Sequence, residues 1–195
     1  MAGLSPQQLK YQESFALVFG AIFAAFIALL WTGLVVASVG GPWGVVLLAV
    51  LVASGVLALA RGVYLWLRYP LKRVALPYLR SWRFWLKFYG VILIEFGFIY
   101  ALIQLLDTKH IEEGLFPLIV FVVGAHFYPL ARWNGSTLWY GTATVLCAAM
   151  VVVVVAVPRD RWMLASAAVM VATMLITSFV SGQRYKQVTN QGGRT

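Results

Sequence analysis

Six long apolar segments, separated by short polar or glycine- and proline-containing stretches, dominate the pattern along the chain. They cover residues 15–38, 43–67, 88–106, 115–131, 137–157 and 162–180. A helix of about 20 apolar residues is long enough to cross the hydrocarbon core of a bilayer. The pattern therefore predicts an all-α integral membrane protein with six transmembrane helices and short loops, built as a single membrane domain over residues 1–195. Residues 181–195 are predicted to form a polar tail.

The composition excludes a soluble domain. Hydrophobic residues make up 62% of the chain and charged residues 11%, whereas soluble domains contain about 25% charged residues. The eight tryptophans mostly fall near the ends of predicted spans, which is typical of the aromatic belt at a membrane interface. We therefore expect the lipid bilayer to be the main partner of this chain.

The distribution of basic residues predicts the topology. Lysines and arginines number 15, against six acidic residues, and short cytoplasmic loops are enriched in basic residues. With a cytoplasmic N-terminus, all but three of these 15 (Lys109, Arg159 and Arg161) lie in cytoplasmic segments. We therefore expect both termini in the cytoplasm. The positive charge follows from this topology, and no nucleic-acid partner is needed to explain it.

A basic connector between spans two and three has an amphipathic pattern. From Leu71 onward its apolar residues recur at helical steps of three and four, and the basic residues lie off that stripe. Such a segment suits a helix lying on a surface of anionic lipid. The alternative is an ordinary positive cytoplasmic loop. The predicted lipid-surface residues are Lys72, Arg73, Arg80, Arg83, Lys87, Trp82 and Trp85.

Ionisable residues within the predicted spans are the main candidates for a site: Arg61, Glu95 and His126. At 1.5 Å per residue, Glu95 lies about 10 Å and His126 about 9 Å from the cytoplasmic ends of spans three and four. Consecutive helices joined by a short loop usually pack side by side, so we expect these two side chains to meet. A carboxylate and an imidazole in contact can exchange a proton near neutral pH.

A purely structural role for these residues is the alternative. Glu95 would then neutralise Arg61, and His126 would bond a backbone carbonyl near Pro129. Proline removes one backbone donor from a helix, and we expect Gly124 and Pro129 to disturb the fourth span around His126.

The segment from Gly124 to Ala131, G-A-H-F-Y-P-L-A, resembles a G-x-H-F-x-P-L-A pattern of small, uncharacterised bacterial multi-span membrane proteins. The resemblance covers eight residues. It implies a multi-pass protein of the bacterial plasma (inner) membrane, and it implies no activity.

The sequence pattern indicates no set of residues for catalysis or for metal binding. His110 lies in a predicted outer loop and His126 within a span, while Cys147 is the single cysteine. We expect no enzyme activity, no metal and no cofactor. The favoured hypothesis is a small transporter or channel with an intramembrane polar site. The alternative is a non-catalytic accessory or assembly subunit, which docks to another membrane protein, to a second copy or to anionic lipid.

Overall fold

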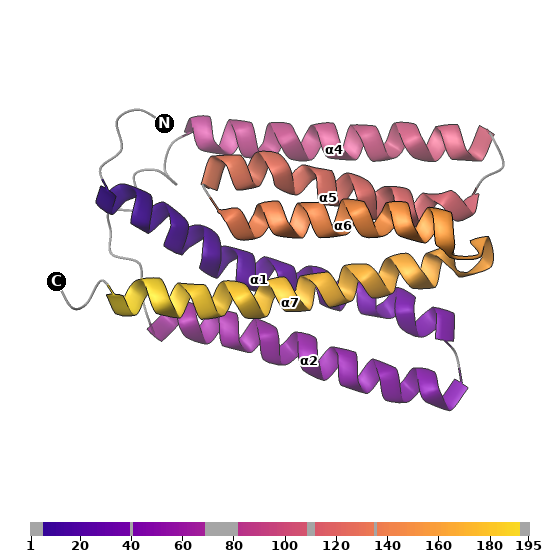
Figure 1. The fold of residues 1–195 in the computed structure, drawn as a ribbon, viewed down its shortest axis with the longest axis horizontal. Helices are drawn as coiled ribbons and strands as arrows, with labels where there is room; N and C mark the ends of the chain where they lie inside the picture. The colour runs from indigo at the N-terminus through magenta and orange to yellow at the C-terminus, as the bar shows by residue number, and fades with distance from the viewer. Residues whose placement is uncertain (1–5, 40, 69–81, 109–111, 135, 192–195) are drawn as a thin grey trace.

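The computed structural model describes residues 6–39, 41–68, 82–108, 112–134 and 136–191, and within them every regular element is helical. In this part of the chain, six long helices and two single 3-10 turns follow one another (Figure 1): α1 (Pro6–Val39), α2 (Gly41–Arg68), α4 (Trp82–Thr108), η2 (Glu112–Gly114), α5 (Leu115–Asn134), α6 (Thr137–Ala156), η3 (Arg159–Arg161) and α7 (Trp162–Gln191).

Four of these helices are long and apolar enough to cross a membrane, which confirms the prediction of a helical membrane protein. The four stretches are Gly44–Arg68, Leu115–Arg132, Thr137–Ala156 and Arg159–Gln187. The apolar stretches of the other two helices, Leu17–Gly33 in α1 and Leu93–Leu106 in α4, are shorter. Within the described residues the structure thus supports four candidate spans, and the six predicted are not confirmed.

The last helix continues past the predicted end of span six. The predicted tail from residue 181 is helical as far as Gln191, where α7 ends. The reason is packing: Ser181 and Tyr185 are fully buried, and Tyr185 belongs to a cluster with Leu17 of α1 and Leu65 of α2. Residues beyond the predicted end of the span therefore still contribute to the interior.

The predicted connector is divided. Lys72, Arg73 and Arg80 lie outside the described residues, so the structure does not test their contact with lipid. The last part of the predicted connector, with Trp82, Arg83, Trp85 and Lys87, instead forms the first turns of α4. These residues extend a long helix, and their contact with a lipid surface stays a prediction.

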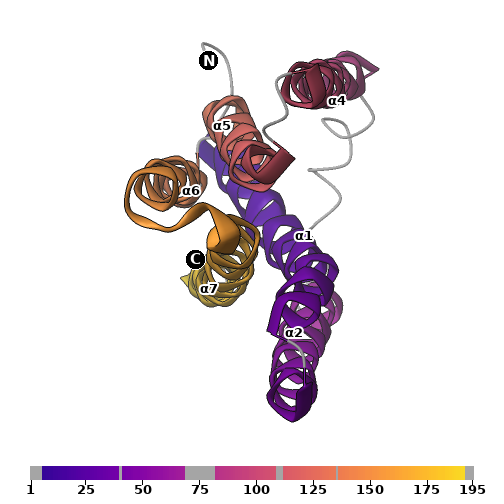
Figure 2. The ribbon, with the colours of Figure 1, turned by 90° about the vertical axis from the view of Figure 1, so that its right-hand side faces the viewer.

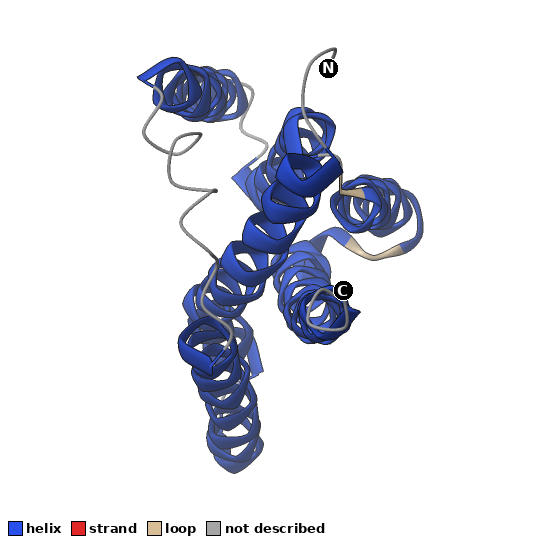
Figure 3. Ribbon diagram, turned by 90° about the vertical axis from the view of Figure 1, so that its left-hand side faces the viewer, coloured by secondary structure: helices blue, strands red, loops and turns tan. Residues whose placement is uncertain are grey.

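The helices lie roughly along one direction, and the start of α1 and the end of α7 are at the same end of the bundle (Figure 1). Along the bundle α1 and α7 cross at its centre, and α5 packs against α6. The views along the helices show α4 and α2 at opposite edges (Figures 2 and 3). Of the described long helices, α4 packs mainly on α5, whereas α2 packs on α1 and α7.

Small residues allow α1 and α7 to approach closely. The face of α1 that carries Ala21, Ala24 and Ala28 is at most 1% exposed. The Ser178 hydroxyl of α7 donates a 2.7 Å hydrogen bond to the Ala21 carbonyl. Helices in a membrane associate through such close packing and interhelical hydrogen bonds, because lipid tails are as apolar as the helices themselves. This interface is the centre of the fold.

Candidate functional site

Glu95 lies in the middle of α4, a 27-residue helix that begins at Trp82 and ends at Thr108. Among the described side chains of α4 from this point on, the partly covered ones are Glu95, Ile99, Leu102 and Leu106, at steps of three and four. This spacing marks one face of a helix, and it is the face turned toward α5. The neighbouring Ile94 is 74% exposed and lies on the outer side.

His126 lies on α5, which two adjacent contacts hold rigidly against α6. A β-carbon at Gly124 would be 2.9 Å from the Leu146 β-carbon, so this glycine permits a close approach of the two helices. Phe127 is 1% exposed, and its ring stacks on Trp139 with centroids 4.9 Å apart and an interplanar angle of 25°. With these two neighbours turned to α6, His126 is left to face α4.

The two side chains meet. Nδ1 of His126 lies 2.6 Å from Oε2 of Glu95, and the side chains are only 11% and 17% exposed. The same Nδ1 has no partner that satisfies hydrogen-bond geometry, so the contact is a close ion-pair approach and not an aligned hydrogen bond. An imidazolium and a carboxylate at this distance attract strongly where water is scarce. The contact places an imidazole nitrogen of α5 against a carboxylate oxygen of α4.

Pro129 and Gly124 do not break the helix that carries His126. We expected these residues to disturb the helix, but α5 runs without interruption from Leu115 to Asn134 with Pro129 inside it. Neighbouring helices allow membrane helices to retain such prolines. The local consequence is smaller: since proline has no N–H, the Ala125 carbonyl accepts no bond from position 129.

Arg61 belongs to a different region. Its guanidinium carbon lies 4.3 Å from the ring centroid of Phe179 on α7, and its buried Nη1 has no hydrogen-bond partner. Among the described residues Glu95 forms its ion pair with His126, and no ion pair joins it to Arg61. The helices of the two residues are at opposite edges of the bundle (Figure 2). The alternative pairing of Glu95 with Arg61 is therefore not formed.

Sequence reasoning missed the aromatic support behind His126. The position of Trp139 near a span end favours the interfacial belt, yet this residue is 5% exposed and lies in the core. Its ring occupies the space left by Gly20, where a β-carbon would overlap it. Gly20 is the small residue that leaves room for the buried Trp139 ring. This glycine is on α1, however, and nothing local indicates it.

No group of three histidine, cysteine or acidic side chains that could hold a metal occurs in the part of the chain that the structure describes. Comparisons with protein-family models, with curated proteins and with solved structures gave no match. The function is therefore argued from the residues of this chain.

Proposed function

We propose that the protein is a small proton-coupled transporter or channel, in which Glu95 and His126 bind and release the proton. The observation that carries this proposal is the 2.6 Å approach of the two side chains near the middle of α4. Ionisable residues at membrane depth are costly, and they commonly mark ion or substrate pathways. Carboxylate and imidazole side chains form the proton relays of many pumps and transporters.

Six membrane spans are part of the proposal. The apolar stretches of α1 and α4 run alongside the four longer candidate spans (Figure 1), within helices of 34 and 27 residues. The basic ends of α2 and α5, at Arg68 and Arg132, lie at the same end of the bundle as the end of α7. This end is the cytoplasmic one if basic residues remain inside. The bacterial plasma membrane is proposed as the location, from the resemblance of residues 124–131.

Proton flux into liposomes tests the proposal. Purified wild-type protein and the variants Glu95→Gln and His126→Ala are compared from about pH 5 to about pH 8, the range in which histidine titrates. Wild-type flux that changes across this range and is lost in both variants is expected. Glu113→Gln, the same change at an exposed carboxylate of η2, is the matched control and should retain full flux.

A wild-type protein without flux would overturn the proposal. If Glu95→Gln and His126→Ala then melt at lower temperature than Glu113→Gln, the pair holds the helices together. In that case the contact between Glu95 and His126 has a structural role and the transport proposal is wrong.

An accessory or assembly subunit is the second candidate, and the exposure of α4 favours it. The apolar side chains of Leu93 and Ile94 are 70% and 74% exposed, and Tyr100 is 66% exposed. Such a face suits either lipid or the helix of another membrane protein. Extraction in a mild detergent distinguishes the two: a stoichiometric partner that co-purifies with the wild type, and that Leu93→Trp displaces, would favour the subunit role.

A further inference from the structure

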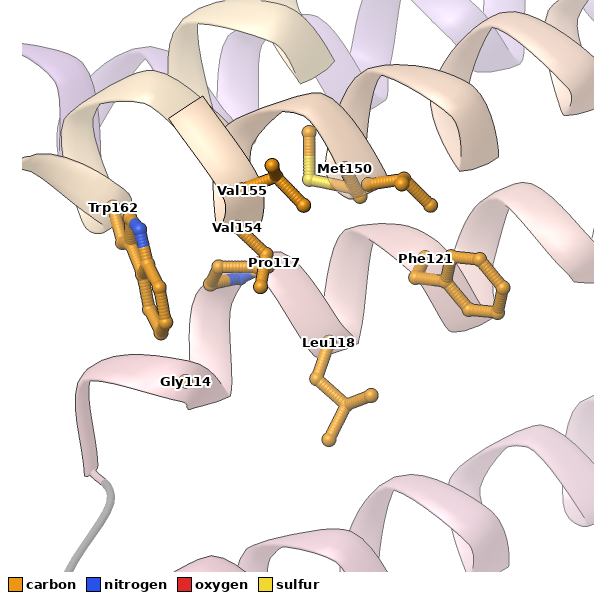
Figure 4. Close-up of a pocket in the computed structure, with 9 residues that line it drawn as sticks. Gly114, Pro117, Leu118, Phe121, Met150, Val154, Val155 and Trp162 are labelled. Atoms are coloured by element: carbon orange, nitrogen blue, oxygen red, sulfur yellow. The ribbon is translucent and has the colours of Figure 1, made fainter. Parts of the chain in front are cut away.

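An apolar groove lies between α5 and α6, close to the end where η2 and η3 turn the chain (Figure 4). Pro117 and Phe121 line it from α5, Val151 and Val154 line it from α6, and Trp162 is at one end. Its volume is about 420 Å³, within the range of about 300–1,000 Å³ usual for small-molecule sites. The lining contains no charged or hydrogen-bonding side chain apart from the tryptophan N–H. An occupant must therefore be apolar along most of its length.

The groove opens sideways from the bundle. Val151 and Val155 are 55% and 81% exposed, although both belong to a helix that is a candidate membrane span, Thr137–Ala156. A groove on this surface faces the acyl chains of the bilayer and not an aqueous channel. Its occupant would enter from the membrane.

A cation stands at the end of the groove. The indole N–H of Trp162 donates a 2.9 Å hydrogen bond to the Val157 carbonyl, which fixes the ring. The guanidinium carbon of Arg159 lies 5.8 Å from the centroid of that ring. Arg161 is 3.8 Å from Asp160, whereas Arg159 forms no ion pair with any described carboxylate. Arg159 therefore places a positive charge at the end of the groove, where a bound apolar ligand would reach the polar interface.

We propose that this groove binds one acyl chain of a glycerophospholipid and that Arg159 binds the phosphate of the same molecule. A guanidinium presents paired N–H donors that match phosphate oxygens, and the apolar lining matches a hydrocarbon chain. A single ligand that is apolar along its length and anionic at one end satisfies both features. The site is separate from the Glu95–His126 pair, and it does not depend on the transport proposal.

Phospholipid retention tests the site. Protein is reconstituted in vesicles of phosphatidylethanolamine and phosphatidylglycerol, extracted into detergent and examined by native mass spectrometry. Wild type is expected to retain one phospholipid of either head group per chain. Val154→Phe, which fills the groove, and Arg159→Gln, which removes the charge, should each lower retention about tenfold, as expected for loss of one charge-assisted contact or of the bound chain's space.

Matched controls separate the site from general effects. Val152→Phe adds the same ring on α6 at a residue that is 60% exposed and outside the lining, and Arg161→Gln removes the neighbouring arginine. Both should retain phospholipid as the wild type does. A melting curve shows whether Val154→Phe folds, and Arg159→Gln tests the proposal independently if it does not.

Three results would overturn the proposal. One is equal retention by wild type and Val154→Phe, which would place the lipid elsewhere. Another is diacylglycerol, which lacks the phosphate, being retained as well as phospholipid. The third is a lipid-free wild-type dimer, in which a second copy covers the groove.

Discussion

The contact of α1 with α7 and the contact of α4 with α5 hold two long helices by different means. The contact between α1 and α7 is made by small side chains such as Ala24 and Ala28, which are 0% and 1% exposed. In the second, the α4 side chains that face α5 are only partly covered, and Glu95 makes the single ion pair that the structure describes between these helices. Close packing therefore positions α7, whereas among the described residues α4 meets α5 through partly covered side chains and the Glu95–His126 pair.

Closing the space at Gly20 should have the largest effect on this comparison. The β-carbon of Gly20→Ala would overlap the Trp139 ring, which also stacks on Phe127. We expect a loss of about 3 kcal/mol, the upper end for overpacking. Thermal unfolding in detergent measures it.

Gly33→Ala is the control for this change, since nothing lies within 4 Å of its β-carbon. Alanine favours a helix by about 0.5–1 kcal/mol over glycine, so this variant should be slightly more stable than wild type. Equal effects of the two alanines would show that the close approach at Gly20 does not matter.

Removing either member of the Glu95–His126 pair should have the next largest effect, confined to α4. Both side chains are mostly buried, and a charge left without its partner is destabilising. Because the pair keeps some exposure, we expect each single variant to lose about 2 kcal/mol of unfolding free energy. A double-mutant cycle should give a coupling energy of about 1 kcal/mol or more. Hydrogen exchange should quicken in α4 and stay unchanged in α1 and α7. Additive effects of Glu95→Gln and His126→Ala would show that the two groups act independently.

A hydroxyl pair between α6 and α7 should matter less. Thr142 and Thr177 lie 2.9 Å apart and buried, and Thr142→Val removes that contact with little change of shape. Interhelical hydrogen bonds in membrane proteins contribute about 0.6 kcal/mol on average. The midpoint of unfolding by a denaturing detergent should fall by a correspondingly small amount. A loss as large as that of Glu95→Gln would contradict the ranking.

The smallest effect is expected at the outer edge of the contact between α5 and α6. Tyr128 and Thr144 share a 3.0 Å hydrogen bond at an exposed position, and Thr144 also donates to the Tyr140 carbonyl. Tyr128→Phe should change stability by less than about 0.5 kcal/mol, as is usual for exposed positions. A large loss in the same unfolding measurement would mean that this edge is covered by a partner.

Reasoning from local pattern was sufficient for the contact between Glu95 and His126. The sequence predicts both residues at similar depth on consecutive helices, and they lie 2.6 Å apart. It was insufficient for Arg61, whose aromatic neighbour Phe179 is on the last helix. Depth follows from counting residues along a helix. Which helices become neighbours depends on side chains far apart in the chain, and counting does not reveal it.

The sequence by itself determined that this is a helical membrane protein and where most of its helices lie, because apolar length and turn residues act locally. Only the tertiary structure decided that α7 extends through residues 181–191, that Trp139 is buried against Gly20 and that α4 stands at the edge of the bundle. Each of these depends on the shapes that two distant segments present to each other. In a membrane, where the lipid is as apolar as the side chains, that fit selects the helix neighbours.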